Sequence, residues 1–447
     1  MWQTLATLQM LQVSTHADEG ASSCFSHSEK QGAHSHVMLQ KDVIGFARAC
    51  RLTTLELARC SLGDRGSQWI AAVLEMNDTV TAVNLALNNI GDQGVQSLAT
   101  ALQNNRSLLA MNLDHNLVSW KGAKFIADAL QKNSGFRTLE FAGNNVSNDG
   151  VAHLARALAS GCLLSTVDLD CNHINHQGAE YLAQALSSNS TLTTIRLAHN
   201  SIGQHGAECV ARALELSSSI STLRLAFCGI GHTGSAAIAG LMEKSGCLTC
   251  LDLEHTIAGA ECAMPLLAAL EKNCTLTSIE LGQNCIGDEG AKGVADALRK
   301  NSTLISIGLA HNEISNLGAQ RILEAVQMNN IIKNVDLAGN GISEELLQLM
   351  TQALSRNRAG MRVLTVRCTH EGPLLSNISC TDLSGNELCI VQLATMEDLA
   401  TLTAAVADKL QFHGHLQFVL SDGTLLTDLT GASMHEFGQV MDAGMVS

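Results

Sequence analysis

Charged side chains recur at a spacing of 28 residues in the middle of this chain. Asp168, Arg196, Arg224 and Asp252 follow one another at that interval. Acidic and guanidinium groups at equal intervals can form ion pairs between neighbouring structural units. They can also anchor a partner, because arginine is enriched among the residues that dominate binding interfaces. Both interpretations stay open at this point.

Histidine and phenylalanine follow the same interval at His199, Phe227 and His255, and further acids stand beside them. We therefore predict a partner-binding surface made of Asp168, Asp170, Arg196, His199, Arg224, Phe227, Asp252, Glu254 and His255. A catalytic or metal site built from Asp114, His115, His199 and His255 is the weaker alternative. Its two later histidines would lie two strands apart, about 10 Å at the usual strand spacing.

Motifs for catalysis and cofactor binding are missing from the sequence. It has no phosphate loop of the form G-x-x-x-x-G-K-S/T, no H-E-x-x-H and no G-x-S-x-G. Cys247 and Cys250 have a spacing typical of zinc ligands, but no second pair lies at a suitable distance to complete four ligands. We predict no catalytic residue, no metal and no cofactor.

An apolar residue recurs every 28 positions from Leu52 to Ile332 and defines eleven units. Further apolar residues three and five positions on, such as Leu55 and Leu57, indicate a strand because their spacing is two. Later in each unit, small and apolar residues at helical spacing predict a helix with one buried face. Parallel strands about 4.8 Å apart, with helices outside, predict an α/β solenoid curved like a horseshoe.

Asparagine stands eight positions after the first apolar residue in eight units. A buried amide can bond backbone groups of its own turn and of the adjacent turn. We therefore predict a structural ladder formed by Asn88, Asn116, Asn144, Asn172, Asn200, Asn284, Asn312 and Asn340. Cys60, Cys228 and Thr256 fill the other three places, where each could form part of the same bonds.

The pattern L-x-x-L-x-L-x-x-N-x-I-G-D-x-G is visible from Val80 to Gly94 and from Leu276 to Gly290. Over residues 52–359 the chain resembles the leucine-rich-repeat family of ribonuclease inhibitor, the NOD-like receptors and the Ran GTPase-activating proteins. The resemblance implies the solenoid fold, whereas function in this family depends on surface residues. It also implies a rival function, activation of a GTPase, although no residue here is matched to a catalytic residue of such activators.

Composition narrows the choice of partner and compartment. The net charge of −15 disfavours nucleic acid and anionic membranes and favours a basic or neutral protein partner. The fifteen cysteines are spread along the chain and are expected to be reduced core thiols. The N-terminus makes a poor signal peptide and no segment is apolar enough to span a bilayer, so we expect a cytoplasmic or nuclear protein. The oligomeric state stays open.

The two ends depart from the repeat. Residues 1–36 are predicted to be a flexible polar leader and residues 37–51 a helical cap, while the solenoid is expected to span 52–370 with a terminal strand at Met361, Leu364 and Val366. Residues 376–447 have a ββαββ pattern, with strands at 378–382 and 388–393, a helix from Thr395 and a second hairpin. This module resembles a ubiquitin-like β-grasp domain, which implies docking at Val419 and, as an alternative, a role as a ubiquitin-system adaptor.

Together these patterns predict a non-enzymatic scaffold or adaptor. The partner is expected on the concave strand face, and the C-terminal module is expected to be a second docking site.

Overall fold

The computed structural model describes residues 52–358, 361–372, 375–381, 387–394 and 415–419. The predicted leader, the N-terminal cap and the helix expected from Thr395 lie outside the described residues. Within the described part, each 28-residue unit contributes one short strand followed by one helix. The chain is therefore an α/β solenoid, as the repeat predicts.

The strands β1–β11 follow one another in chain order in one parallel sheet. They are β1 (Thr54–Glu56), β2 (Ala82–Asn84), β3 (Ala110–Asn112), β4 (Thr138–Glu140), β5 (Thr166–Asp168), β6 (Thr194–Arg196), β7 (Thr222–Arg224), β8 (Cys250–Asp252), β9 (Ser278–Glu280), β10 (Ser306–Gly308) and β11 (Asn334–Asp336).

The helices alternate with these strands. They are α3 (Gly63–Met76), α4 (Asp92–Asn104), α5 (Trp120–Leu130), α6 (Ser147–Ala159), α7 (His176–Leu186), α8 (Gly203–Leu214), α9 (Gly231–Lys244), α10 (Ala260–Lys272), α11 (Gly287–Lys300), α12 (Asn316–Met328) and α13 (Glu344–Arg358).

The apolar repeat positions form the core between the strand layer and the helix layer. Val80, Val83 and Leu85 of one unit are no more than 2% exposed, and so are Leu98 and Leu102 of the following helix. Burying each such side chain contributes roughly 1.5–3 kcal/mol. Because one unit has no second layer of its own to cover these groups, the contacts between successive units stabilise the fold.

A glycine near the start of each of nine helices is required by lack of space. A Cβ atom on Gly122 would lie 2.5 Å from Val118 Cγ1 and 2.8 Å from Asp92 Oδ1. That same carboxylate accepts hydrogen bonds from the backbone N–H groups of Ser119 and Gly122, at 2.8 and 3.0 Å. Asp92 therefore caps the helix of the next unit, and the glycine lets the two units approach closely.

The eight asparagines that follow the strands connect successive turns. The Asn116 amide donates to the carbonyls of Leu85 and Leu113 at 3.0 and 2.9 Å, and its Oδ1 accepts from the N–H groups of Asn88 and Ile90. A single buried side chain therefore satisfies backbone groups of two turns, which would otherwise be costly to bury. The equivalent bonds of the thiol of Cys228 and the hydroxyl of Thr256 are single donations, to Leu197 and Leu225.

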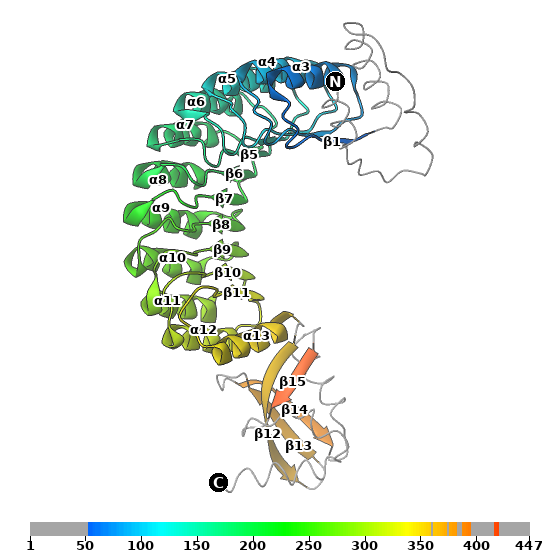
Figure 1. Ribbon diagram of the computed structural model, residues 1–447. Coiled ribbons are helices and arrows are strands. Elements are labelled where there is room, and N and C mark those ends of the chain that lie inside the picture. The colour runs from blue at the N-terminus through cyan, green and yellow to red at the C-terminus, as the bar shows by residue number, and fades with distance from the viewer. Residues whose placement is uncertain (1–51, 359–360, 373–374, 382–386, 395–414, 420–447) are drawn as a thin grey trace. The chain divides into compact units, whose positions relative to one another are not determined.

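The described chain divides into two compact units. Of the described residues, the first contains 52–269 and 279–284, and the second contains 270–278 and those from 285 onward. Within the first unit, helices α3–α9 lie along one side and strands β1–β8 along the other (Figure 1). We call the side of β1–β8 that faces away from the helices the strand face, and it includes Glu280 of β9, which belongs to the same unit.

The second unit contains α11–α13, β10 and β11, followed by a separate four-stranded sheet. Its strands are β12 (Met361–Gly372), β13 (Leu375–Thr381), β14 (Glu387–Ala394) and β15 (His415–Val419), in the order β14–β13–β12–β15. Neighbours β12–β13 and β13–β14 are antiparallel, while β12 and β15 are parallel.

One prediction is corrected by this sheet. Met361, Leu364 and Val366 were expected to form the terminal strand of the solenoid, but they belong to β12, which pairs with β13 and β15. In the repeat, the next first position after Ile332 is Gly360, one residue before Met361. A strand that begins at Met361 is thus displaced by one residue from the repeat, and such a shift exchanges the two faces of a strand.

Among the described helices, none combines the length and the apolar character that crossing a membrane requires.

Candidate partner-binding site on the strand face

The charged residues of the predicted site lie in two columns on the strand face. The first column contains the last residue of each strand and runs in register from Asp168 of β5 through Arg196 and Arg224 to Asp252 of β8. The second column lies two residues later in each unit, in the turn after the strand, and includes Asp170 and Glu254. Residues 28 positions apart in the sequence therefore lie side by side on neighbouring strands, because the strands are parallel and in register.

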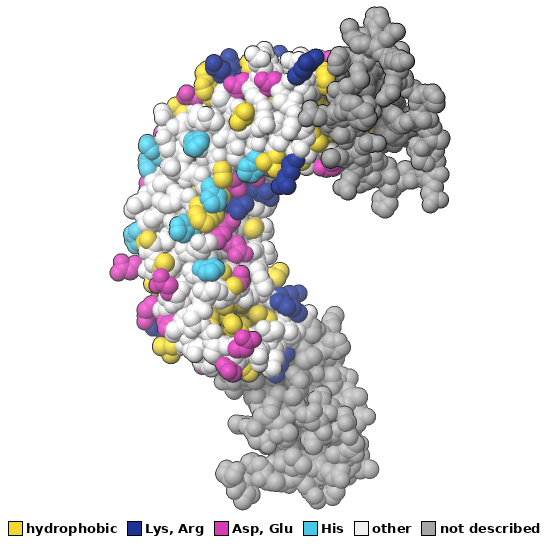
Figure 2. All heavy atoms as spheres, in the orientation of Figure 1, with side chains coloured by type: hydrophobic (Ala, Val, Ile, Leu, Met, Phe, Trp, Pro, Cys, Tyr) yellow, Lys and Arg dark blue, Asp and Glu magenta, His cyan; other side chains and the backbone are white. Residues whose placement is uncertain are grey.

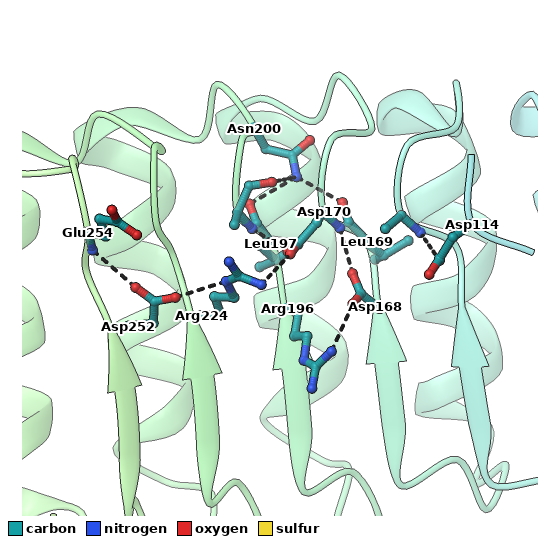
Figure 3. Close-up of polar contacts among 12 residues, drawn as sticks. Asp114, Asp168, Leu169, Asp170, Arg196, Leu197, Asn200, Arg224, Asp252 and Glu254 are labelled. Carbon is teal, nitrogen blue, oxygen red and sulfur yellow. Dashed lines mark hydrogen bonds and ion pairs between the residues drawn. The ribbon is translucent and has the colours of Figure 1, made fainter. Parts of the chain in front are cut away.

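The two neighbouring arginines turn away from each other. Arg196 Nη1 lies 3.2 Å from Asp168 Oδ2, while Arg224 extends in the opposite direction along the strands (Figure 3). Arg224 Nη1 lies 3.1 Å from Asp170 Oδ2, and Nε lies 2.8 Å from Asp252 Oδ2. The Nε–H direction does not meet hydrogen-bond geometry, so this last contact is an ion pair.

The ion pairs expected with Asp168 and Asp252 are therefore present, and Arg224 forms an additional one with Asp170. The two arginines differ in how completely they are engaged. The Arg196 side chain is 43% exposed and contacts one carboxylate, whereas Arg224 bridges two. Arg196 thus retains guanidinium N–H groups that can reach a partner.

Asp168 and Asp170 also have structural roles. Asp168 Oδ1 accepts from the backbone N–H of Asp170 at 3.0 Å, and Asp170 Oδ1 accepts from the N–H of Ala198 in the next unit at 2.6 Å. Burial raises the pKa of Asp170 to about 6, with a further rise from Asp168, and Arg224 opposes the shift. Arg224 and the N–H of Ala198 therefore offset only part of the cost of burying the charged Asp170 carboxylate.

Asp114 occupies the position equivalent to Asp170 two units earlier. Its Oδ1 accepts from the backbone N–H of Ala142 at 2.7 Å, and its Oδ2 accepts from the Asn112 amide at 3.1 Å. Burial raises the pKa of Asp114 to about 6, and the nearby carboxylates of Asp168 and Glu140 raise it further. Neutral donors hold this carboxylate, so its negative charge is poorly compensated.

Three aromatic rings from successive units stack next to these columns. The centroids of His199 and Phe227 lie 4.2 Å apart with an interplanar angle of 13°, and those of Phe227 and His255 lie 4.7 Å apart at 30°. The two histidines are exposed and Phe227 is half-buried. All three have a left-handed backbone, with φ of 55°, 57° and 46°.

This conformation costs non-glycine residues about 1–2 kcal/mol, and hydrogen bonds between units offset it. The N–H groups of His199 and Phe227 donate to the carbonyls of Ala226 and Glu254, each at 2.8 Å. The left-handed turn recurs in most units, so the backbone places this position identically each time. The residue type alone decides that rings stack here.

The structure thus brings the nine predicted residues together over β5–β8 of the first unit. In the space-filling view, histidine, acidic and basic side chains gather along the strand side of that unit (Figure 2). The alternative grouping of Asp114, His115, His199 and His255 has no support as a metal centre. Within residues 52–358 no group of three or more histidine, cysteine, aspartate or glutamate side chains could hold a metal ion.

A comparison with protein-family models agrees with the repeat. A family model described as Leucine Rich repeat matches residues 77–99, 188–211 and 272–295. The chain contains leucine-rich repeats. No curated protein matches it significantly in sequence.

Solved structures with similarity to the leucine-rich-repeat chain are remote. The Rad7–Elc1 complex of yeast matches with 13% identity and a TM-score of 0.41, covering 71% of this chain and 86% of that one. A complex of TLR13 with single-stranded RNA matches with 16% identity and a TM-score of 0.37, covering 67% and 41%. The actin-binding site 2 of leiomodin-1 matches with 14% identity and a TM-score of 0.25, covering 48% and 90%.

A second asparagine ladder was missed by the sequence analysis. It lies at the opposite edge of the repeat, where each helix returns to the next strand. The Asn105 amide donates to the carbonyls of Leu74 and Asn77, and its Oδ1 accepts from the N–H of Leu108. Its members are Asn77, Asn105, Asn133, Asn189, Asn273, Asn301, Asn329 and Asn357, all buried. Their recurrence three residues before the first apolar position was the available signal.

Proposed function

We propose that the strand face binds a protein partner and that the chain acts as a non-enzymatic scaffold or adaptor. The observation that carries this proposal is the stack of His199, Phe227 and His255 beside the paired Arg196 and Arg224. Arginine and aromatic side chains are the residue types that most often dominate binding energy at interfaces. Both types coincide here on one solvent-facing surface.

The equivalent positions in other units support this assignment. Where units six to eight have His199, Phe227 and His255, the fourth and eleventh units have Gly143 and Gly339. The solenoid therefore folds without a ring at this position. Rings that the scaffold does not require, stacked and partly exposed, are expected to serve recognition.

Substitution of Arg196 and Phe227 tests the proposal. We expect the full chain to enrich a defined set of proteins from lysate, and a variant with Arg196→Glu and Phe227→Ala to lose them. Lys124→Glu on the exposed side of α5 is the matched control for reversal of a positive charge. Circular dichroism would establish that both variants are folded. Unchanged enrichment by the strand-face variant would refute the proposal.

The C-terminal module is proposed as a second docking site. Strands β13 and β14 overlap the strands predicted at 378–382 and 388–393, and β15 ends at Val419, the proposed contact residue. Its resemblance to ubiquitin-like domains motivates both docking and the alternative role as a ubiquitin-system adaptor. Deleting residues 376–447 should remove a subset of captured proteins, and loss of partner ubiquitylation would favour the adaptor role.

The finer resemblance to ribonuclease inhibitor, NOD-like receptors and Ran GTPase-activating proteins is also kept as a proposal. An activator acts on the phosphates of its partner, so its own chain needs no enzymatic motif. Single-turnover GTP hydrolysis with a panel of small GTPases would test this function. We expect no acceleration, and a clear acceleration would replace the scaffold function with GTPase activation.

A further inference from the structure

The strand face over β3–β9 has many more carboxylates than cations. Its first and second columns contain seven carboxylates and two arginines. The carboxylates are Asp114, Glu140, Asp168, Asp170, Asp252, Glu254 and Glu280, and the arginines are Arg196 and Arg224. Both arginines are engaged with Asp168, Asp170 and Asp252. Among the described residues, Arg196 and Arg224 therefore compensate the middle of this face.

Carboxylates on both sides of that middle are held by neutral donors. Asn112 donates its amide to Glu140 and to Asp114, and the Gln283 amide donates to Glu254 Oε1 at 2.7 Å. Hydrogen bonds from amides orient a carboxylate without cancelling its charge. A cation from another molecule would therefore improve the electrostatics at both ends of the face.

Carboxylates also stand next to the ring stack along the chain. Asp170 lies one unit before His199, and Glu254 directly precedes His255. A guanidinium group can stack on an aromatic ring while it forms paired hydrogen bonds to a carboxylate. Rings and carboxylates side by side therefore suit arginine better than they suit an acidic or purely apolar side chain.

We propose that a basic, arginine-containing segment of the protein partner binds across the strand face from β3 to β9. This inference rests on the proposed function and names the chemistry of the partner at the same site. The seven strands cover about 29 Å at the usual strand spacing, which corresponds to roughly nine extended residues. Nucleic acid is disfavoured because its phosphates would meet the same carboxylates.

A synthetic peptide tests this chemistry directly. The probe is a labelled peptide of about twelve residues in which arginine and alanine alternate, and its binding to the full chain is followed by fluorescence anisotropy. A peptide with citrulline in place of arginine keeps the length and planar shape of the side chain, but a carbonyl oxygen replaces one of its terminal nitrogen donors and the positive charge is lost. We expect the arginine peptide to bind at least about ten-fold more tightly, which corresponds to about 1.4 kcal/mol.

Isosteric variants locate the binding. Asp114→Asn, Glu140→Gln and Glu254→Gln together remove three charges of the strand face that do not pair with Arg196 or Arg224. We expect this triple variant to weaken binding of the arginine peptide about ten-fold. The control combines Asp128→Asn, Asp149→Asn and Glu180→Gln, three exposed acids of the helix layer, and should leave the affinity within about two-fold.

Two results would overturn the inference. Equal weakening by both triple variants would show general attraction to an acidic chain, and equal binding of the citrulline peptide would show that charge is not recognised. In either case, loss of the lysate partners in the Arg196→Glu and Phe227→Ala variant would still support protein binding at the strand face. Retention of those partners would remove the proposed function as well.

Discussion

Two stretches of the solenoid differ in the side chains that bond the backbone groups of the turns after their strands. In the second to sixth units, asparagine occupies every ladder position from Asn88 to Asn200, and each amide bonds carbonyls of two turns. In the seventh and eighth units, Cys228 and Thr256 occupy this position. Cys228 donates to Leu197 at 3.0 Å, and Thr256 donates to Leu225 and accepts from the N–H of Cys228.

The surface differs between the same two stretches. Phe227 and His255 directly precede Cys228 and Thr256, and the doubly paired Arg224 belongs to the same pair of units. The ring stack thus overlaps the place where the internal ladder changes from amides to smaller donors. In a repeat protein, each residue can be compared with its equivalents in the other units. Here the change of ladder residue and the stacked rings both occur at the proposed binding surface.

Removing an amide from the ladder should have the largest effect. Asn172 is fully buried, and its amide donates to Phe141 and Asp170 while its Oδ1 accepts from Val146. We expect Asn172→Ala to lower the free energy of unfolding by about 3–5 kcal/mol, because several buried backbone groups lose their partners. Cys228→Ala should cost only about 1 kcal/mol. Denaturant unfolding measures both, and equal losses would contradict the comparison.

Removing Arg224, which forms two ion pairs, should destabilise the fold more than removing Arg196, which forms one. Arg224→Ala leaves Asp170 and Asp252 without their shared cation, so we expect a loss of about 2 kcal/mol. Arg196→Ala removes a single pair of a 43% exposed side chain and should cost less than about 0.5 kcal/mol. Thermal unfolding of the two variants compares them, and a larger loss for Arg196→Ala would show that Arg224 is the less important of the two.

Asp114 makes stability depend on pH. Because the pKa of Asp114 is raised to about 6 in the folded chain, its stabilising contribution is complete below its ordinary pKa of 3.8 and is lost as the pH rises through 6. Asp114→Asn lacks this dependence. Relative to the parent chain, we expect the variant to gain about 1 kcal/mol of stability between pH 5 and pH 8. Unfolding curves of both chains at the two pH values measure this difference. If the variant gains no stability relative to the parent, the pKa of Asp114 is not raised in the folded chain.

Restoring the amide in the seventh unit should have the smallest effect, in the opposite direction. Asparagine is close to cysteine in volume, and by register its Oδ1 at position 228 would face the N–H groups of Asn200 and Ile202. We expect Cys228→Asn to raise the free energy of unfolding by about 0.5–1 kcal/mol. A melting temperature measured under reducing conditions tests this. A decrease would indicate that packing around Cys228 does not accept an amide.

Most of the solenoid could be predicted because its pattern is periodic. The recurrence of Leu52, Leu55 and Leu57 in eleven units predicts strand, core and register together, since equivalent residues of a parallel stack lie side by side. The buried helix residues Leu98 and Leu102 follow from the same reasoning. The four-stranded sheet has no such period, so the partners of Met361–Gly372 were predicted wrongly.

The candidate site was predictable as a set of residues but not as an arrangement. The 28-residue interval places Asp168, Arg196, Arg224 and Asp252 in one column, and the sequence determines that much by itself. Only the tertiary structure decides that Arg224 extends to Asp170 and that His199 and His255 cover both sides of Phe227. The reason is physical: backbone periodicity determines where each Cα lies, whereas the direction of a long side chain depends on charges and rings in neighbouring units.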